Sequence, residues 1–250
     1  MAINVNTVYQ TVLLILNKEQ RGYMTPTEFN SISTQVQLEV FEKYFEDMNQ
    51  QIRVPQTDTD YADRVENIDE KIAIFKTFGS TNYISNNNLN YFVPSRIDSY
   101  GNNITFYRLG TVLYNNEIEV QRVDRSDFYH IDKSLLTKPS KTFPVYLYEN
   151  NYLFIKPITI TSDIQLDYIR KPVDVIWGFT VGSLGQYIYN SNIFDSSTEP
   201  NGSIDFELHS SEQTELILKI LIYAGIVIRD PNIIQAAAQQ VANDEANKKS

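Results

Sequence analysis

The feature that most constrains the fold is a stripe of apolar residues at helical spacing near each end of the chain. At the start, apolar residues recur at intervals of three and four from Ile3 to Leu16, which is the spacing of one helix face. The same spacing returns over residues 210–228 and, after Asp230-Pro231, over residues 231–241. A helix with one apolar face is unstable alone, so we expect these faces to be buried against one another.

A long helix is predicted to follow the first one. Thr25-Pro26-Thr27-Glu28 combines an N-cap threonine, a first-turn proline and the glutamate of a capping box. The apolar stripe then continues over residues 29–52, which predicts a helix of about 27 residues. A third helix is predicted within residues 56–78, with Gly79 placed to end it.

The middle of the chain has the alternation of β-strands. Two pairs of alternating runs flank turn residues, and both indicate hairpins: 104–114 and 117–123 around Asn115-Asn116, and 144–148 and 152–155 around Glu149-Asn150-Asn151. Residues 164–169 predict a further strand, and residues 124–136 a short crossing helix. Residues 177–203 contain Gly, Pro, Tyr and Asn without a clear period, which predicts a long loop.

These patterns predict an α+β fold with an inserted domain. Residues 1–79 and 210–250 form a bundle of N- and C-terminal helices, and residues 80–209 form an antiparallel β-rich domain that includes the loop at 177–203.

Composition excludes several classes of function. The chain has 31 acidic and 21 basic residues, a formal charge of -10, which disfavours wrapping of nucleic acid. It has no cysteine, which excludes disulfides, thiolate zinc sites and a cysteine nucleophile. The first residues lack the pattern of a signal peptide, and no apolar run has the length of a membrane span, so we expect synthesis in the cytosol and no membrane contact.

No motif indicates catalysis, a cofactor or a metal. His130 and His209 are the only histidines, and they fall in different predicted elements. Gly182-Ser183-Leu184-Gly185 matches neither a nucleophile elbow nor a phosphate-binding loop, so we interpret it as a turn. Asp58-Thr59-Asp60 begins like a calcium loop, but the glycine and the distal glutamate are missing. We therefore expect a chain that is not an enzyme.

Aromatic residues point to contacts between proteins instead. The chain has 17 Tyr and 13 Phe but one Trp, and tyrosine offers a large contact area at a small cost in entropy. We expect helix 2 and the C-terminal helices to carry a lateral contact, and the Tyr- and Asn-rich loops to bind a neighbour. Removal of residues 177–203 should then spare folding but abolish attachment. The candidate interface residues are Phe41, Tyr44, Phe45, Trp177, Tyr187, Tyr189 and Phe194.

Two parts of the sequence resemble a known family. Residues 8–16 and the following NKEQRGYMTPTEFN (residues 17–30) resemble the start of neck or ring proteins of crAss-like and related short-tailed bacteriophages. FPVYLY (residues 143–148), IKP (155–157) and YIRKP (168–172) resemble the β portion of such structural proteins.

This resemblance implies a virion structural protein, a head-to-tail connector of the phage neck or tail. Its family members form a closed homo-oligomeric ring, which implies a dodecamer that follows the portal and contacts the portal and other neck or tail proteins. Genomic DNA would pass through the lumen without sequence-specific binding, and an acidic wall would repel its phosphates. The resemblance places the protein in the virion after assembly in the host bacterial cytoplasm.

Two other classes of function stay open at the level of sequence. A receptor- or carbohydrate-binding tail module would use exposed Tyr, Asn and Trp177 to stack on and hydrogen-bond to sugars. A hydrolase would need His130 or His209 beside a suitable acid or nucleophile.

Overall fold

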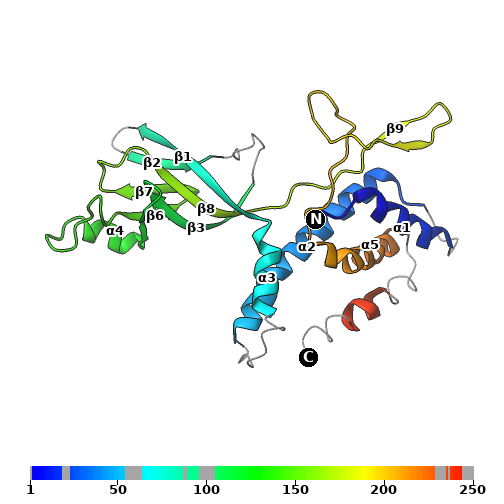
Figure 1. Ribbon diagram of the computed structural model, residues 1–250, viewed down its shortest axis with the longest axis horizontal. Coiled ribbons are helices and arrows are strands. Elements are labelled where there is room, and N and C mark those ends of the chain that lie inside the picture. The colour runs from blue at the N-terminus through cyan, green and yellow to red at the C-terminus, as the bar shows by residue number, and fades with distance from the viewer. Residues whose placement is uncertain are drawn as a thin grey trace. The chain divides into compact units, whose positions relative to one another are not determined.

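The protein is a mixed α/β chain in which helices accompany a large, mostly antiparallel sheet (Figure 1). The computed structural model describes residues 2–18, 23–53, 64–86, 89–95, 105–228, 235 and 237–243. It divides into two compact units. The helical unit comprises residues 1–74 and 172–250, and the sheet unit comprises residues 75–171.

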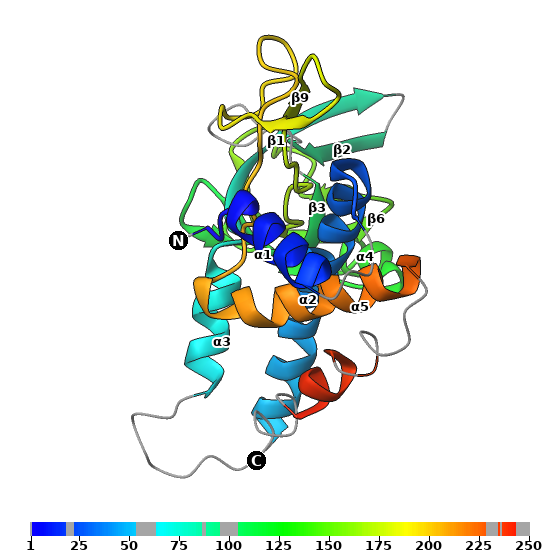
Figure 2. The same cartoon turned by 90° about the vertical axis from the view of Figure 1, so that its right-hand side faces the viewer.

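The helical unit is built around a long helix, α2 (Pro26–Arg53). Helix α5 (Gln213–Ile228), which follows the short 3-10 helix η2 (Ser210–Glu212), packs against α2 and against α1 (Val5–Lys18) (Figure 2). Helix α3 (Arg64–Ala73) also packs on α2. The apolar stripes predicted from sequence supply the buried side chains of this unit, among them Val12, Leu16, Phe29, Val36, Leu216 and Ile220.

The start of α2 confirms the predicted capping box. The Thr25 hydroxyl oxygen accepts from the Glu28 backbone N–H at 3.4 Å, and the Glu28 carboxylate accepts from the Thr25 backbone N–H at 2.9 Å. The Thr25 backbone N–H and the Thr25 hydroxyl both donate to the Glu28 carboxylate, and these two hydrogen bonds hold the pKa of Glu28 below its usual value.

A ladder of polar side chains on α2 binds an extended segment that lies far away in sequence. Asn30 accepts from the Trp177 N–H at 2.8 Å, and Thr34 Oγ1 accepts from the Val175 N–H at 3.1 Å. The Gln37 side-chain amide donates to the Val173 carbonyl at 2.7 Å. The three side chains of α2 lie at i, i+4 and i+7, which is one helix face, and their partners are alternate residues, which lie on one side of an extended chain. The spacing of the helix face therefore matches the spacing of the extended segment.

Gln37 also fixes a second segment. Its Oε1 accepts from the Glu207 N–H at 2.9 Å, although the residue is only 1% exposed. Residues 204–206 in turn bridge Ile176 and Ile3, and the Asp205 carboxylate accepts from the Val5 N–H at 2.8 Å, at the start of α1. One buried amide therefore holds together α2 and both extended segments that flank the 177–203 region.

Two buried carboxylates dock α5 and η2 on the other helices. Glu215 pairs with Lys43 of α2 at 2.9 Å, and Glu212 pairs with Lys71 of α3. Both glutamates are buried, so each ion pair offsets a desolvation cost that an unpaired carboxylate would impose.

The sheet unit contains eight strands in the order β4-β3-β8-β1-β2-β7-β6-β5. Their bounds are β1 Lys76–Asn86, β2 Leu89–Pro94, β3 Phe106–Tyr114, β4 Ile118–Glu119, β5 Gln121–Arg122, β6 Val145–Glu149, β7 Tyr152–Lys156 and β8 Ile164–Arg170. All paired neighbours are antiparallel except β5 and β6. The hairpin predicted over residues 144–155 is confirmed. The hairpin predicted over residues 104–123 is confirmed in part, because β4 pairs with β3 whereas β5 pairs in parallel with β6. The turns of both use positive φ angles at Asn115, Asn116, Asn150 and Asn151.

Strand β1 belongs to both halves of this sheet. Residues 76–80 pair with β8, and residues 81–86 pair with β2. The core is formed by buried side chains from several strands and the segments that join them: Phe92, Val112, Val120, Tyr146, Leu153, Ile155, Ile160, Ile164, Leu166 and Tyr168. The chain enters and leaves the unit at neighbouring positions, because the Arg170 N–H donates to the Phe75 carbonyl at 3.0 Å.

Three predicted boundaries are corrected by the structure. Residues 76–79 belong to strand β1 and not to the third helix, and Phe78 is exposed, so it was not part of a buried stripe. The crossing helix α4 is short, Arg125–Ile131, and turns replace its predicted second half. Residues 172–209, predicted to belong to the β-rich domain, cluster with the helices because α2 binds their backbone.

Some predicted features lie outside the described residues. They include the carboxylates at 58–63 and the turn at Arg229-Asp230-Pro231. Of the last predicted helix, residues 237–243 are described and are helical.

Two glutamines of α2, Gln37 and Gln35, allow a matched test of the buried amide. Gln37→Met keeps the size of the side chain but leaves the Val173 carbonyl and the Glu207 N–H without their partner, so we expect a loss of about 2–4 kcal/mol of unfolding free energy. Gln35→Met, at an exposed position two residues away, should change it by less than about 0.5 kcal/mol. Urea unfolding measures both, and equal effects would contradict the role of Gln37.

Candidate functional site

The candidate site is the β9–β10 hairpin of the helical unit together with the loop that follows it, residues 178–202. Strand β9 (Phe179–Val181) pairs with β10 (Tyr187–Tyr189) in antiparallel register. The turn between them is closed by the Gly182 N–H, which donates to the Gln186 carbonyl at 2.8 Å. Gly185 adopts a φ of +79°, which only glycine takes without strain. The prediction of a turn at residues 182–185 is therefore confirmed, whereas the prediction of one long loop over 177–203 was wrong.

A chain of aromatic rings anchors the base of the hairpin to the helices. The Trp177 ring stacks on Phe179 and Tyr189, with centroid distances of 5.9 and 5.5 Å, and its centroid lies 4.5 Å from that of Tyr9 in α1. Tyr9 continues to Phe29 of α2 at 4.7 Å. The hairpin therefore extends the core of the helical unit outwards.

Polar contacts fix the same base. The Trp177 indole N–H donates to Asn6 of α1 at 3.0 Å, and the Tyr9 hydroxyl donates to the Met24 carbonyl at 3.0 Å. Ser203 Oγ accepts from the Gly178 N–H at 3.0 Å and donates to the Asn190 carbonyl at 2.6 Å. These hydrogen bonds fix Trp177 to α1 and the start of β9 to the returning chain.

Two glycines permit the returning chain to pass close to the hairpin. A Cβ at Gly178 would lie 2.0 Å from the Asn201 carbonyl oxygen, and a Cβ at Gly202 would lie 2.5 Å from the Phe194 Cα. Between them, the Asp195 carboxylate accepts from the Ser197 N–H at 2.9 Å and from the Ser197 and Thr198 hydroxyls. These hydrogen bonds hold the pKa of Asp195 well below its usual range, so the loop keeps this charge at physiological pH.

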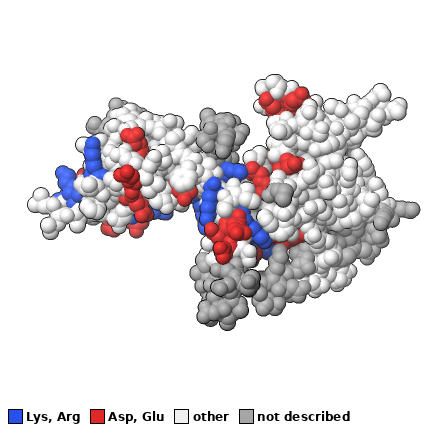
Figure 3. All heavy atoms as spheres, in the orientation of Figure 1, with Lys and Arg blue, Asp and Glu red and all other residues white. Residues whose placement is uncertain are grey.

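Beyond this ordered base, the hairpin and loop expose apolar side chains. Leu184 is 90% exposed at the tip and Ile193 is 85% exposed in the loop, and Val181, Tyr187 and Ile188 are also exposed. No residue from 177 to 194 is charged, and the tip is uncharged in Figure 3. An ordered, uncharged and apolar protrusion of this kind is typical of a surface that binds another protein.

The structure separates the predicted interface residues into two groups. Phe41, Tyr44, Phe45 and Trp177 are buried within the helical unit, so their assignment to an interface is corrected: these side chains form its core. Tyr187, Tyr189 and Phe194 lie on the hairpin and its loop, Tyr187 exposed and the other two half-buried. Because Trp177 is only 5% exposed, removing residues 177–203 would damage the core, which also corrects the expectation that folding would be spared.

Sequence reasoning missed the residues that are most exposed at this site. Val181, Leu184 and Ile193 are aliphatic, and the search for contact residues concentrated on aromatic side chains. A signal was available, because Leu184 lies between Gly182 and Gly185 in a turn, where an apolar side chain has no strand or helix face to bury it.

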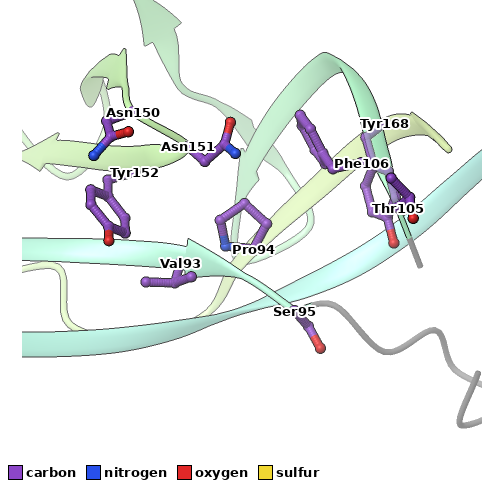
Figure 4. Close-up of a pocket in the computed structure, with 9 residues that line it drawn as sticks. All are labelled: Val93, Pro94, Ser95, Thr105, Phe106, Asn150, Asn151, Tyr152 and Tyr168. Atoms are coloured by element: carbon purple, nitrogen blue, oxygen red, sulfur yellow. The ribbon is translucent and has the colours of Figure 1, made fainter. Parts of the chain in front are cut away.

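The sheet unit contains a second candidate site, a pocket of about 390 Å³. In Figure 4, Asn150, Asn151 and Tyr152 from the β6–β7 hairpin face Phe106 and Tyr168 across Pro94. Asn151 already accepts from the Tyr148 hydroxyl at 2.9 Å, so part of its hydrogen-bonding capacity is used within the protein. The lining combines amides with aromatic rings.

The two histidines belong to different units of the chain. His130 is exposed on α4 of the sheet unit, whereas His209 belongs to the helical unit, where its Nδ1 accepts from the Ser211 N–H at the start of η2. Among the described residues, no group of three or more His, Cys, Asp or Glu side chains could hold a metal ion.

No helix in the described ranges is long and apolar enough to cross a membrane. No protein-family model matches the sequence, and no curated protein sequence matches it significantly. What the site does must therefore be inferred from its own geometry.

The burial of Tyr9 and Tyr44 can be tested through the pH dependence of the unfolding free energy. Burial raises the pKa of Tyr9, and burial together with the Glu212 and Glu215 carboxylates raises the pKa of Tyr44. Both hydroxyls then stay protonated in the folded chain after the unfolded chain has begun to ionise near pH 10. The contribution of these two tyrosines to stability should therefore be constant below about pH 10 and fall above it.

The phenylalanine variants separate the two hydroxyls at neutral pH. Tyr9→Phe leaves the Met24 carbonyl without its donor and should cost about 1 kcal/mol. Tyr44→Phe should cost nothing, because the Tyr44 hydroxyl has no hydrogen-bond partner in the described part of the chain. Each variant should also weaken the alkaline loss of stability. Fluorescence of Trp177, the single tryptophan, follows unfolding, and an unchanged alkaline slope in both variants would contradict the assignment.

Proposed function

We propose that this chain is a structural protein of a bacteriophage virion. Copies of it form an oligomeric ring of the neck or tail, and this ring connects the portal to the tail and lets DNA pass through its lumen. The observation that carries the assembly role is the β9–β10 hairpin, whose apolar tip is exposed while its base is fixed by Trp177, Tyr9 and Asn6. The assignment to a virion rests on the resemblance of residues 8–30 and 143–172 to phage neck and ring proteins.

A preordered hairpin suits a subunit that must join a large assembly. Association loses free energy when side chains and loops become ordered at the interface, and that cost is smaller for a segment that is ordered beforehand. The hairpin base already has its hydrogen bonds and ring contacts, so a partner needs only to cover Val181, Leu184 and Ile188. We propose that this tip docks into the next component along the portal-to-tail axis.

The distribution of charge supports passage of DNA. The helical unit contains 22 acidic and ten basic residues, a formal charge of -12, so the excess of negative charge in the chain resides there. A lumen wall built from this unit would repel phosphates and let DNA slide without adhering. In this proposal the N- and C-terminal helices form the bundle of each ring subunit, which the packing of α5 on α1 and α2 supports.

A receptor- or carbohydrate-binding tail module is the second candidate, and the pocket of the sheet unit favours it. Asn150, Tyr152 and Phe106 offer the amide and aromatic groups that recognise sugars. Trp177 cannot take part, because it is buried in the helical unit. Binding of the full chain to a glycan array, abolished by Tyr152→Ala, would favour this candidate. No binding to any glycan, together with rings in negative-stain images, would favour the connector.

The connector proposal predicts the effect of a polar hairpin tip. Val181→Ser with Leu184→Ser should leave the unfolding free energy within about 0.5 kcal/mol of the wild type, because both side chains are exposed. Phage that carry the double variant should assemble filled heads that lack tails, because the docking surface is lost. Electron microscopy of purified particles measures the fraction of heads with tails.

The control is Leu14→Ser, which changes an exposed apolar residue of α1 in the same unit. It should leave the fraction of tailed particles at the wild-type level. Normal tails on particles with the Val181→Ser/Leu184→Ser chain would contradict the assigned role of the hairpin, and absence of the chain from purified virions would contradict the function as a whole.

A further inference from the structure

The sheet unit carries an exposed loop that none of the preceding assignments explains. Residues 132–143 follow α4, and in this loop Leu135 is 100% exposed and Leu136 is 97% exposed. Phe143, where the loop ends, is exposed as well. Three of its other residues are exposed lysines, Lys133, Lys138 and Lys141.

The loop is held at both ends, so its tip is presented in a defined way. Lys156 of β7 pairs with Asp132 at 2.8 Å and lies 4.7 Å from the centre of the Phe128 ring in α4. At the other end, Ser140 and Phe143 exchange backbone hydrogen bonds of 3.3 and 3.2 Å. Beneath α4, Phe128 packs on Val145 and Leu147 in a small core of its own. The leucines are exposed although the segment around them is anchored.

The ion pair at the base changes the charge of the loop. Asp132 is the only acidic residue from 128 to 148, and Lys156 already pairs with it. Lys133, Lys138 and Lys141 therefore give the loop that carries the two leucines a net positive charge. In Figure 3, basic side chains lie beside uncharged ones at the end of the sheet unit that carries α4. An apolar tip with a basic rim fits a partner that is acidic around an apolar surface.

The chain itself offers a partner of that charge. The sheet unit has 11 basic and nine acidic residues, a formal charge of +2, against -12 for the helical unit. Two copies of the chain are therefore attracted when the sheet unit of one meets the helical unit of the other, and repelled when two helical units meet. This arrangement favours contact between two different patches, which is the heterologous contact that closes a ring by rotation.

We propose that loop 132–143 is the lateral contact of the assembly, and that it docks on the acidic helical unit of a second copy of this chain. The proposal deepens the proposed ring, because it names one of the two patches that each subunit must present. In this contact the lysines orient the two copies and raise the rate of association, and Leu135 and Leu136 supply the apolar area that becomes buried.

Self-association of the full chain tests the proposal. The wild type should form species larger than the monomer in sedimentation velocity at micromolar concentration, and these should weaken as NaCl rises from about 0.05 to about 0.5 M. Leu135→Ser with Leu136→Ser should weaken association about tenfold or more. Lys133→Glu, Lys138→Glu and Lys141→Glu together should do the same. The matched control, Ile158→Ser, removes an exposed apolar residue of the sheet unit outside the loop and should associate like the wild type.

Zero-length crosslinking identifies the partner surface. Carbodiimide joins a lysine only to a carboxylate that it contacts, and mixing isotopically light and heavy chains separates crosslinks between copies from those within one copy. We expect Lys133, Lys138 or Lys141 of one copy to be joined to carboxylates within residues 1–74 or 172–250 of another. A monomeric wild type, or crosslinks between copies that reach only the sheet unit, would overturn the proposal.

Binding assays with the same variants distinguish two other ligands for the loop, anionic lipid and duplex DNA. Co-sedimentation with phosphatidylserine vesicles that requires Leu135 and Leu136, in a chain that stays monomeric, would mean that the loop binds anionic lipid and would overturn the proposal. Binding of duplex DNA that requires the lysines, again without self-association, would do so as well. A monomeric chain that is still built into virions would refute this contact and leave the connector role standing. Self-association of a chain that is absent from virions would do the reverse.

Discussion

The helical unit depends on the match between one face of α2 and the backbone of a segment that lies more than a hundred residues later. Asn30, Thr34 and Gln37 satisfy backbone groups at residues 173, 175 and 177, and Gln37 reaches residue 207 as well. Backbone groups buried without partners would each cost free energy comparable to a lost hydrogen bond. Because these partners come from side chains, the segment can cross the buried surface of a helix without belonging to a sheet.

The candidate binding surface follows from that constraint. The polar ladder on α2 ends at Trp177, whose ring packs against Tyr9, Phe179 and Tyr189. The backbone is therefore fixed on entry to β9 and again at Ser203 on its return. What lies between can expose leucine and isoleucine without collapsing onto the core, because neither end is free to move inwards. The exposure is a consequence of how the base is held.

Sequence patterns predicted the parts of this molecule that local chemistry determines. The capping box at Thr25 and Glu28, the long stripe of α2 and the two asparagine turns rely on residues close together in the chain, and the structure confirms them. The strand after α3 was missed because Phe75 and Phe78 happen to continue a helical spacing, whereas pairing with β8 decides the conformation there. Leu135 continued the spacing of α4 in the same misleading way, although the helix ends at Ile131.

The candidate site was harder to predict, since its residues are defined by distant partners. Phe41 lies on the predicted apolar stripe of α2, which indicated burial, but nothing near Trp177 in sequence shows that it is a core residue, because only its docking on α1 and α2 buries it. Asn30, Thr34 and Gln37 interrupt an otherwise apolar helix face at a regular spacing, and that regularity was the available signal. The hairpin tip and loop 132–143 became visible as surfaces only when fractional exposure was known.

The hydrogen bond between Arg170 and Phe75 has a consequence for the history of such chains. The first and last residues of the sheet unit are therefore neighbours. A module with adjacent ends can be inserted into a host fold, or exchanged for another, without disturbing the path of the host chain. Recombination at residues 74–75 and 171–172 could therefore replace the sheet unit by another domain while the helical unit is kept.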